Sequence, residues 1–323
     1  MRAALAVALL ASAACGPAQG PVSPSAPAVV SAEPAAAEHV KRHVKLRFEL
    51  GGRAFPLPVV HGTVSGEPTW MLVDTGANSH VVAGWLARKA HLETRNLGDV
   101  GTDHTGRAIV TSRVDHPKVL VDEWGAFPDG PILVTEVPEA VARLGIGAFI
   151  SPQALAAADG AIVLDLRNAE MREEDGGHPQ ALLGARGAEV FGTTAHTCAD
   201  DDSPIKGLAF VIPATVEGTR AALLLDTGAH HTDLLSSTPI GKRFLPRSVP
   251  NREQVYAASG KIVTRTVRAA KVTLGEYAVV TDVDLIPGES DPSCPRDGVL
   301  AMDILRSCVI VLERAKAYGR CGG

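Results

Sequence analysis

An internal repeat is the feature that most constrains the fold of this chain of 323 residues. When the sequence is shifted by 152 residues, the tetrapeptide Asp-Thr-Gly-Ala at residues 74–77 falls on an identical tetrapeptide at residues 226–229. Residues 59–73 align without a gap to residues 211–225. A repeat of this kind predicts two copies of one supersecondary unit.

Each copy has the pattern of a β-hairpin that leads to an aspartate. Two short apolar runs flank a turn that contains Gly66 in the first copy and Gly218 in the second, as is typical of a hairpin. The ends of the copies also match, because residues 161–165 resemble residues 309–313. Aromatic residues make up only 4% of the chain, so the core must rest on aliphatic side chains that pack well on pleated sheets. We therefore predict an all-β fold with two similar lobes.

The repeat and the composition together predict the domain organisation. We place an N-terminal lobe at residues 44–172 and a C-terminal lobe at residues 205–318, joined by a polar connection at residues 173–204. Residues 16–43 are rich in Pro and Ala, which is the composition of a linker.

Residues 1–15 have the pattern of an export signal. Arg2 precedes a short apolar run, and small residues follow up to Cys15. The run is too short to span a bilayer. Ser-Ala-Ala-Cys resembles a bacterial lipobox, although Ser12 stands where that motif usually has Leu; the alternative is ordinary cleavage after a small-residue site at residues 11–13. We predict an exported protein of the periplasm or cell envelope, attached to the membrane only through a lipid on Cys15.

The two aspartates of the repeat are candidates for a site in which two acids act as a pair. Turn chemistry explains one Asp-Thr-Gly loop, but not two equivalent loops that each follow an apolar strand. If Asp74 and Asp226 meet within hydrogen-bond distance, they cannot both ionise easily. One carboxylate can then activate a water molecule while the other, protonated carboxyl donates to a substrate carbonyl. The glycines allow tight turns that bring amide donors near the carboxylates.

This pattern resembles the aspartic peptidases, and within them the retropepsin-like branch. The resemblance covers both lobes, and residues 297–305 are similar to the closing motif of bacterial retropepsin-like domains. It implies two retropepsin-like β-barrel lobes with the active site at their interface, a peptide or protein substrate and no cofactor. Asp74 and Asp226 would be the catalytic pair, and Thr75 and Thr227 would interlock below them. The supporting residues would be Thr75, Gly76, Ala77, Thr227, Gly228 and Ala229.

Two departures from the family pattern lead to further expectations. The closing motif usually has Gly where this chain has Ala301, whereas lobe one keeps Gly145 in the segment that we align with the closing motif. We expect the methyl group of Ala301 to crowd the loop behind Asp226. Pepsin-like enzymes usually carry Ser or Thr at the fourth position of the motif, whereas this chain has Ala77 and Ala229. Because Ala has no hydroxyl to support a carboxylate, we expect higher pKa values for the pair and a pH optimum less acidic than that of pepsin.

Flaps close over the substrate in this family, and two turns are candidates here. The first contains His104 and Gly106, and the second contains Tyr256 and Gly260. Tyr256 could pack over a bound peptide or against a neighbouring strand.

Other residues favour ordinary structural roles. His230, His231 and His80 do not match a metal-ligand spacing, so we expect no metal site. The net charge of −5 leaves no basic surplus for nucleic acid. In an oxidising compartment four cysteines allow two disulfides in three possible pairings, unless one of them, in an apolar run, is simply buried. These cysteines are Cys198, Cys294, Cys308 and Cys321.

The sequence thus predicts a monomeric aspartic endopeptidase that hydrolyses peptide bonds with water activated by Asp74 and Asp226. The alternative is a catalytically inactive retropepsin-like protein that binds peptides or cell-envelope components. A third possibility is that each lobe pairs with another chain rather than with its sister.

Overall fold

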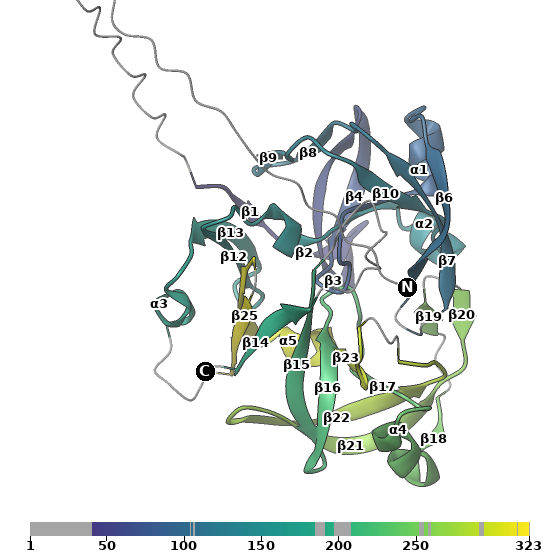
Figure 1. Ribbon diagram of the computed structural model, residues 1–323, viewed down its shortest axis with the longest axis vertical. Helices are drawn as coiled ribbons and strands as arrows, with labels where there is room; N and C mark the ends of the chain where they lie inside the picture. Colours follow the sequence, from purple (N-terminus) through teal and green to yellow (C-terminus); the bar gives the residue numbers. More distant parts are fainter. Residues whose placement is uncertain are drawn as a thin grey trace, which may run out of the picture. The chain divides into compact units, whose positions relative to one another are not determined.

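The computed structural model describes residues 41–103, 105, 107–184, 191–196, 208–251, 255–257, 260–290, 294–314 and 316–322. Strands dominate this part of the chain, and they form two lobes around two large sheets (Figure 1). The predicted all-β, two-lobed fold is confirmed. Cys15 and the rest of the proposed signal and linker lie outside the described residues.

The repeated hairpins form as the sequence predicts. In the first lobe β3 (Arg53–Val64) pairs with β4 (Glu67–Val73), and the two turn residues have φ values of 48° and 89°. In the second lobe β15 (Ala209–Val216) pairs with β16 (Thr219–Leu225), and the turn residues have φ values of 50° and 73°. Two successive positive φ values match the twist of a tight hairpin, which is why a glycine stands at the second turn position in both copies.

A third strand in each lobe runs parallel to the strand that delivers the aspartate. In lobe one β11 (Ile146–Ile150) lies beside β4, and in lobe two β23 (Gly298–Leu300) lies beside β16. The remaining elements of lobe one are β2 (Arg47–Leu50), β5 (Val81–Ala83), α1 (Gly84–Lys89), β6 (Arg95–Thr102), β7 (Ala108–Val114), β8 (Val119–Val121), β9 (Gly125–Ala126), β10 (Ile132–Thr135), α2 (Glu139–Arg143) and η1 (Pro152–Leu155).

Lobe two repeats this plan. Strand β17 (Asp233–Leu235) pairs with β23 and with β22 (Tyr277–Ile286), as β5 pairs with β11 and β10 in lobe one. The remaining elements are α4 (Pro239–Phe244), η3 (Leu245–Arg247), β18 (Val249–Pro250), β19 (Val255–Ala257), β20 (Gly260–Ile262), β21 (Arg265–Leu274) and α5 (Met302–Leu305).

The two halves of the chain also share one sheet. Strand β12 (Gly160–Asp165) of the first half pairs antiparallel with β24 (Cys308–Glu313) of the second. On the outer side of β12 lie β13 (Glu170–Asp175) and β1 (His43–Lys45), and beyond β24 lies β25 (Lys316–Cys321) (Figure 1). The predicted connection contributes α3 (Pro179–Leu183) and β14 (Phe191–His196), which pairs with both β25 and β15. The domain boundaries stay predictions.

Aliphatic side chains fill the core, as the low aromatic content requires. The main cluster runs through both lobes and the shared sheet. Burying a Val, Leu, Ile, Phe or Met side chain contributes about 1.5–3 kcal/mol, so the strands that place the site are held by many small terms. The largest fully buried side chains are those of Phe210, Met71, Leu86, Ile146, Ile150, Ile162, Leu164, Leu166, Met171, Ile212, Leu223 and Leu225.

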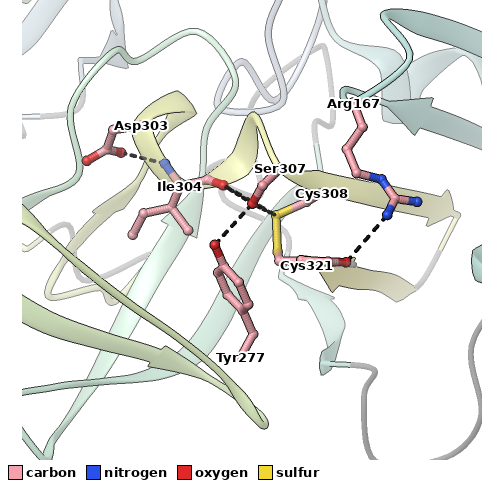
Figure 2. The surroundings of a disulfide bond; sticks show 8 residues. Arg167, Tyr277, Asp303, Ile304, Ser307, Cys308 and Cys321 are labelled. Carbon is pink, nitrogen blue, oxygen red and sulfur yellow. Dashed lines mark hydrogen bonds between the residues drawn. A yellow bond between two sulfur atoms is a disulfide. The ribbon is translucent and has the colours of Figure 1, made fainter.

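A disulfide closes the C-terminal end of the shared sheet. Cys308 of β24 and Cys321 of β25 are opposite one another in the antiparallel register and are joined by a bond (Figure 2). Beside it, the Tyr277 hydroxyl lies 3.2 Å from the Ser307 hydroxyl. The alternative that Cys308 is merely buried in an apolar run is therefore wrong. Cys294 is disulfide-bonded as well, whereas Cys198 lies outside the described residues.

Candidate active site

The two Asp-Thr-Gly-Ala loops lie at equivalent ends of two parallel strand pairs. The Asp74 amide donates to the Ile150 carbonyl at 2.8 Å, and the Asp226 amide donates to the Leu300 carbonyl at 3.0 Å. Each aspartate is thus held by the strand beside the one that delivers it. This arrangement follows directly from the apolar strand that precedes each aspartate in the sequence.

Two buried threonines tie the loops together. The Thr75 amide donates to the Thr227 hydroxyl at 3.1 Å, and the Thr227 amide donates to the Thr75 hydroxyl at 3.0 Å. The Thr75 hydroxyl donates in turn to the Leu225 carbonyl at 2.9 Å, and that of Thr227 to the Val73 carbonyl at 2.7 Å. Neither threonine has any solvent exposure. We call these four hydrogen bonds the threonine grip.

The glycine of each loop gives room to the carboxyl group of the other. A Cβ atom at Gly76 would lie 2.6 Å from the Asp226 Oδ2 atom, and a Cβ atom at Gly228 would lie 2.6 Å from both carboxyl oxygens of Asp74. Real side chains do not tolerate such contacts. These two positions therefore require glycine because of the close approach of the carboxyl groups.

The two carboxyl groups are hydrogen-bonded to each other and differ in their surroundings. The Asp74 Oδ1 atom accepts from the amides of Gly76 at 2.8 Å and Ala77 at 3.1 Å. Among the described residues, Asp226 accepts one backbone hydrogen bond, from Gly228 at 2.7 Å. The second lobe therefore supports its carboxylate less well than the first lobe does.

The pKa values of the pair follow from this difference. Burial raises the pKa of Asp74, while the hydrogen bonds that it accepts oppose the rise. Burial, and then the charge of Asp74 and its hydrogen bond, raise the pKa of Asp226 well above its ordinary value. The pair titrates as a unit, and the surroundings raise the pKa of Asp226 more strongly than that of Asp74.

The strand pairing behind the aspartates shows that the sequence alignment of the closing motif with lobe one is wrong. Because Ile150 pairs with Val73 and Leu300 pairs with Leu225, the counterpart of Ala301 is Ser151. The alignment of Ala301 with Gly145 is wrong, since two more residues separate the motifs in lobe one than in lobe two. Ala301 is fully buried, and Asp226 still keeps its amide bond to Leu300.

The two lobes brace this position with different side chains. The Ser151 amide donates to the Nδ1 atom of His80 at 3.1 Å, and the Ala301 amide donates to the Thr232 hydroxyl at 3.1 Å. His80 and Thr232 are related by the same shift of 152 residues. Desolvation lowers the pKa of His80 to about 4, so the ring is neutral and can accept at Nδ1.

A glutamine that the sequence did not single out also contacts the first loop. The Gln153 Nε2 atom donates to the carbonyls of Thr75, Ala77 and Leu208. No motif marked it, because the shifted alignment hid its equivalence to Asp303 of the closing motif.

The flap predictions are only partly covered by the structure. His104 and Gly106 lie outside the described residues, as does the side chain of Tyr256, while Gly260 begins β20 with a φ of 117°. The hairpin of β6 and β7 reaches the second lobe, because the Glu289 amide donates to the Thr105 carbonyl at 3.2 Å. Which hairpin covers the dyad stays a prediction.

A hollow lies beside the tip of that hairpin. Thr105 and Arg107 line it from lobe one, and residues 236–237 and 287–289 line it from lobe two. Both lobes therefore offer polar groups to one surface depression.

The described residues contain no group of three or more His, Cys, Asp or Glu side chains placed to hold a metal ion. The rings of His230 and His231 lie close together, with centroids 3.9 Å apart and planes tilted by 45°. Within the same residues, no helix has the length and apolar character needed to cross a membrane.

A match to a known protein family agrees with this geometry. The family described as aspartyl protease matches residues 60–150 and 212–304, which is one match per lobe and more than half of the chain. The crystal structure of an aspartic proteinase from Irpex lacteus aligns with a TM-score of 0.48 and 12% identity, over 88% of this chain and 98% of that one. No curated protein sequence matches the chain.

The fold and the paired loops define a two-lobed aspartic peptidase architecture. The chain belongs to the aspartyl protease family, because the family match extends over most of both lobes. Membership of this family supports a peptidase.

Proposed function

We propose that this protein is an aspartic endopeptidase in which Asp74 and Asp226 activate water for peptide-bond hydrolysis. The observation that carries the proposal is the hydrogen-bonded pair of carboxyl groups, from buried Asp226 and half-buried Asp74, on two equivalent loops. A duplicated hairpin with a purely structural role has no need of two acids in contact and shielded from water, which cost stability.

The proposed reaction uses one proton on the dyad. Ionised Asp74 takes a proton from water as the water oxygen bonds to the peptide carbon, and Asp226 gives its proton to the carbonyl oxygen. The neutral tetrahedral intermediate then collapses. Its hydroxyl proton returns to Asp226, Asp74 gives its proton to the amine nitrogen, and the carbon–nitrogen bond breaks. The dyad ends in its starting state, and no metal or covalent nucleophile enters these steps.

A peptide-library digest followed by mass spectrometry tests the proposal. Wild type is compared with Asp74→Asn and Asp226→Asn between pH 3 and 8, and with Asp122→Asn as a control, because Asp122 is an exposed acid of lobe one. Wild type and the control are expected to cut the same bonds, and the two dyad variants to lose cleavage by at least about a thousandfold. If wild type cuts no peptide, the result supports the alternative of a catalytically inactive peptide-binding protein. If the dyad variants cut as well as wild type, another site is responsible for cleavage.

We also propose that the enzyme acts as a monomer. The support is that both loops of the threonine grip come from one chain, so no second copy is needed to complete the dyad. Light scattering on the active fraction tests this, and activity confined to a dimer would contradict it.

Export and lipid attachment at Cys15 remain part of the proposal. The disulfide between Cys308 and Cys321 supports an oxidising compartment. Mass spectrometry of the N-terminus from membranes tests lipidation. A mature protein that begins after a site at residues 11–13 and stays in the soluble fraction would contradict it.

A further inference from the structure

The Gln153 side chain connects the loop that carries Asp74 to the Leu208 carbonyl. It lies in η1 directly after β11, and only 2% of its surface is exposed. Its Nε2 atom lies 3.0 Å from the Thr75 carbonyl, 2.9 Å from that of Ala77 and 2.9 Å from that of Leu208. Because carbonyl oxygens only accept hydrogen bonds, three of them around one atom fix the orientation of the amide.

The contact with Thr75 acts on the support of Asp74. The Thr75 carbonyl and the Gly76 amide belong to the same planar peptide group, and the Gly76 amide donates to Asp74 at 2.8 Å. A hydrogen bond to the carbonyl end of a peptide fixes its plane and polarises its amide end. Gln153 also holds the Ala77 carbonyl, so the peptide that carries the second donor to Asp74 is anchored on both sides.

The second lobe has no such side-chain donor at the equivalent position, and its Ala229 carbonyl accepts instead from the Met302 backbone amide at 3.1 Å. The strand register makes Asp303 the counterpart of Gln153. Asp303 accepts from the Thr232 amide at 3.1 Å, the Thr232 hydroxyl at 2.7 Å and its neighbour Ile304 at 3.0 Å. An ionised carboxylate has no proton to offer to the loop that carries Asp226.

We propose that Gln153 is a positioning residue that holds the first loop so that Asp74, and not Asp226, carries the negative charge of the dyad. This inference rests on the proposed peptidase function. Within it, Asp74 acts as the base and Asp226 as the acid because lobe one has a hydrogen-bond donor at position 153, whereas lobe two has an acceptor at the equivalent position 303. Hydrogen bonds to a charged group are roughly twice as strong as neutral ones. A small change in the direction of the Gly76 and Ala77 amides therefore has a large effect on the stability of the ionised Asp74 carboxylate.

The test uses the full chain with ¹³C-labelled aspartate and follows the carboxyl signals of Asp74 and Asp226 by NMR as the pH is changed. Gln153→Met keeps the length of the side chain and removes the donors. Gln153→Glu keeps the shape and leaves one donor while its carboxyl is protonated. Thr69→Val is the matched control, because Thr69 is a buried residue of lobe one that donates to the Gly145 carbonyl at 3.0 Å, away from the dyad.

In wild type the first proton is expected to leave Asp74. Loss of aimed donors destabilises the charged form, so in Gln153→Met the first ionisation is expected to shift to higher pH by about one unit, and in Gln153→Glu by less. The acid limb of kcat/KM should shift by the same amount, with kcat about tenfold lower and KM changed less than about twofold. Thr69→Val should lose stability without either shift.

Two results would overturn the inference. One is a wild-type titration in which Asp226 loses its proton first. The other is a folded Gln153→Met variant, or a folded Gln153→Glu variant if the first does not fold, with an unchanged first ionisation. The titration needs no turnover, so a failure of the proposed function in the peptide digest leaves this result readable.

Discussion

Loss of either hydroxyl of the threonine grip should reduce both stability and activity, because one side chain from each loop holds the other loop in place. Thr227→Val removes a hydroxyl that accepts from the Thr75 amide and donates to the Val73 carbonyl. Both partners are then left buried without that bond. Each unsatisfied group costs about 1–3 kcal/mol, so the free energy of unfolding should fall by about 2–6 kcal/mol.

Thr238→Val is the matched control for this change. The Thr238 hydroxyl also accepts from an amide, that of Gly241, and donates to a carbonyl, that of Leu235, but it caps α4. Its loss should cost about 1 kcal/mol and leave turnover intact. Thr227→Ser keeps the hydroxyl and should retain most of the activity.

The assay combines urea unfolding with peptide cleavage well below the midpoint of unfolding. In the folded fraction, Thr227→Val should lose at least about a hundredfold in kcat, because a small misplacement of one carboxyl disrupts the dyad. A folded Thr227→Val that is as active as Thr238→Val, or a Thr227→Ser that is as inactive as Thr227→Val, would contradict this role of the Thr227 hydroxyl.

Three further predictions concern stability and pH. The pKa of Asp226 is raised well above its ordinary value in the folded state, so the unfolded chain gives up this proton first and stability falls as the pH rises above about 4; Asp226→Asn should therefore raise the melting temperature at pH 7 relative to wild type, but not at pH 3, as calorimetry can check. The pKa of His80 is lowered to about 4, so the unfolded state binds a proton first as the pH falls from about 6.5 to 4, and up to about 3 kcal/mol of stability is lost there. His80→Thr, which copies Thr232, should flatten this loss in urea titrations at several pH values, and an unchanged pH dependence would refute the assignment. Cys308 and Cys321 enclose a loop with a separation of 13 residues, so the double change to Ser should lower the free energy of unfolding by about 3 kcal/mol; an unaltered urea midpoint would contradict this.

Much of the site could be predicted because the repeat keeps a constant shift where the chemistry lies. The hairpins and the loops of Asp74 and Asp226 are separated by 152 residues throughout. A gapless hairpin with a fixed two-residue turn fixes the register of its strands. For the same reason, the equivalence of His80 and Thr232 could have been found from the sequence.

The rest could not be predicted because the shift changes to 150 residues in the closing motif, as the pairing of Ile150 and Leu300 shows. The motif in lobe one has Ser151 and Gln153 where lobe two has Ala301 and Asp303, so little identity remained to fix the alignment. The shared sheet was also hidden, since strand β14 lies in a stretch with a polar composition, and its pairing with β25 depends on contacts distant in sequence.

In the proposed mechanism, one proton shared by Asp74 and Asp226 drives peptide hydrolysis. The pH dependence of kcat/KM for a single cleaved peptide tests it most directly. We predict a bell-shaped profile with a maximum less acidic than that of pepsin, because Ala77 and Ala229 offer no hydroxyl to the carboxylates. When either aspartate is changed to Asn, the rate should fall by at least about a thousandfold at every pH. A maximum near pH 2 would contradict the role of the two alanines, and a profile that survives either substitution would contradict the dyad itself.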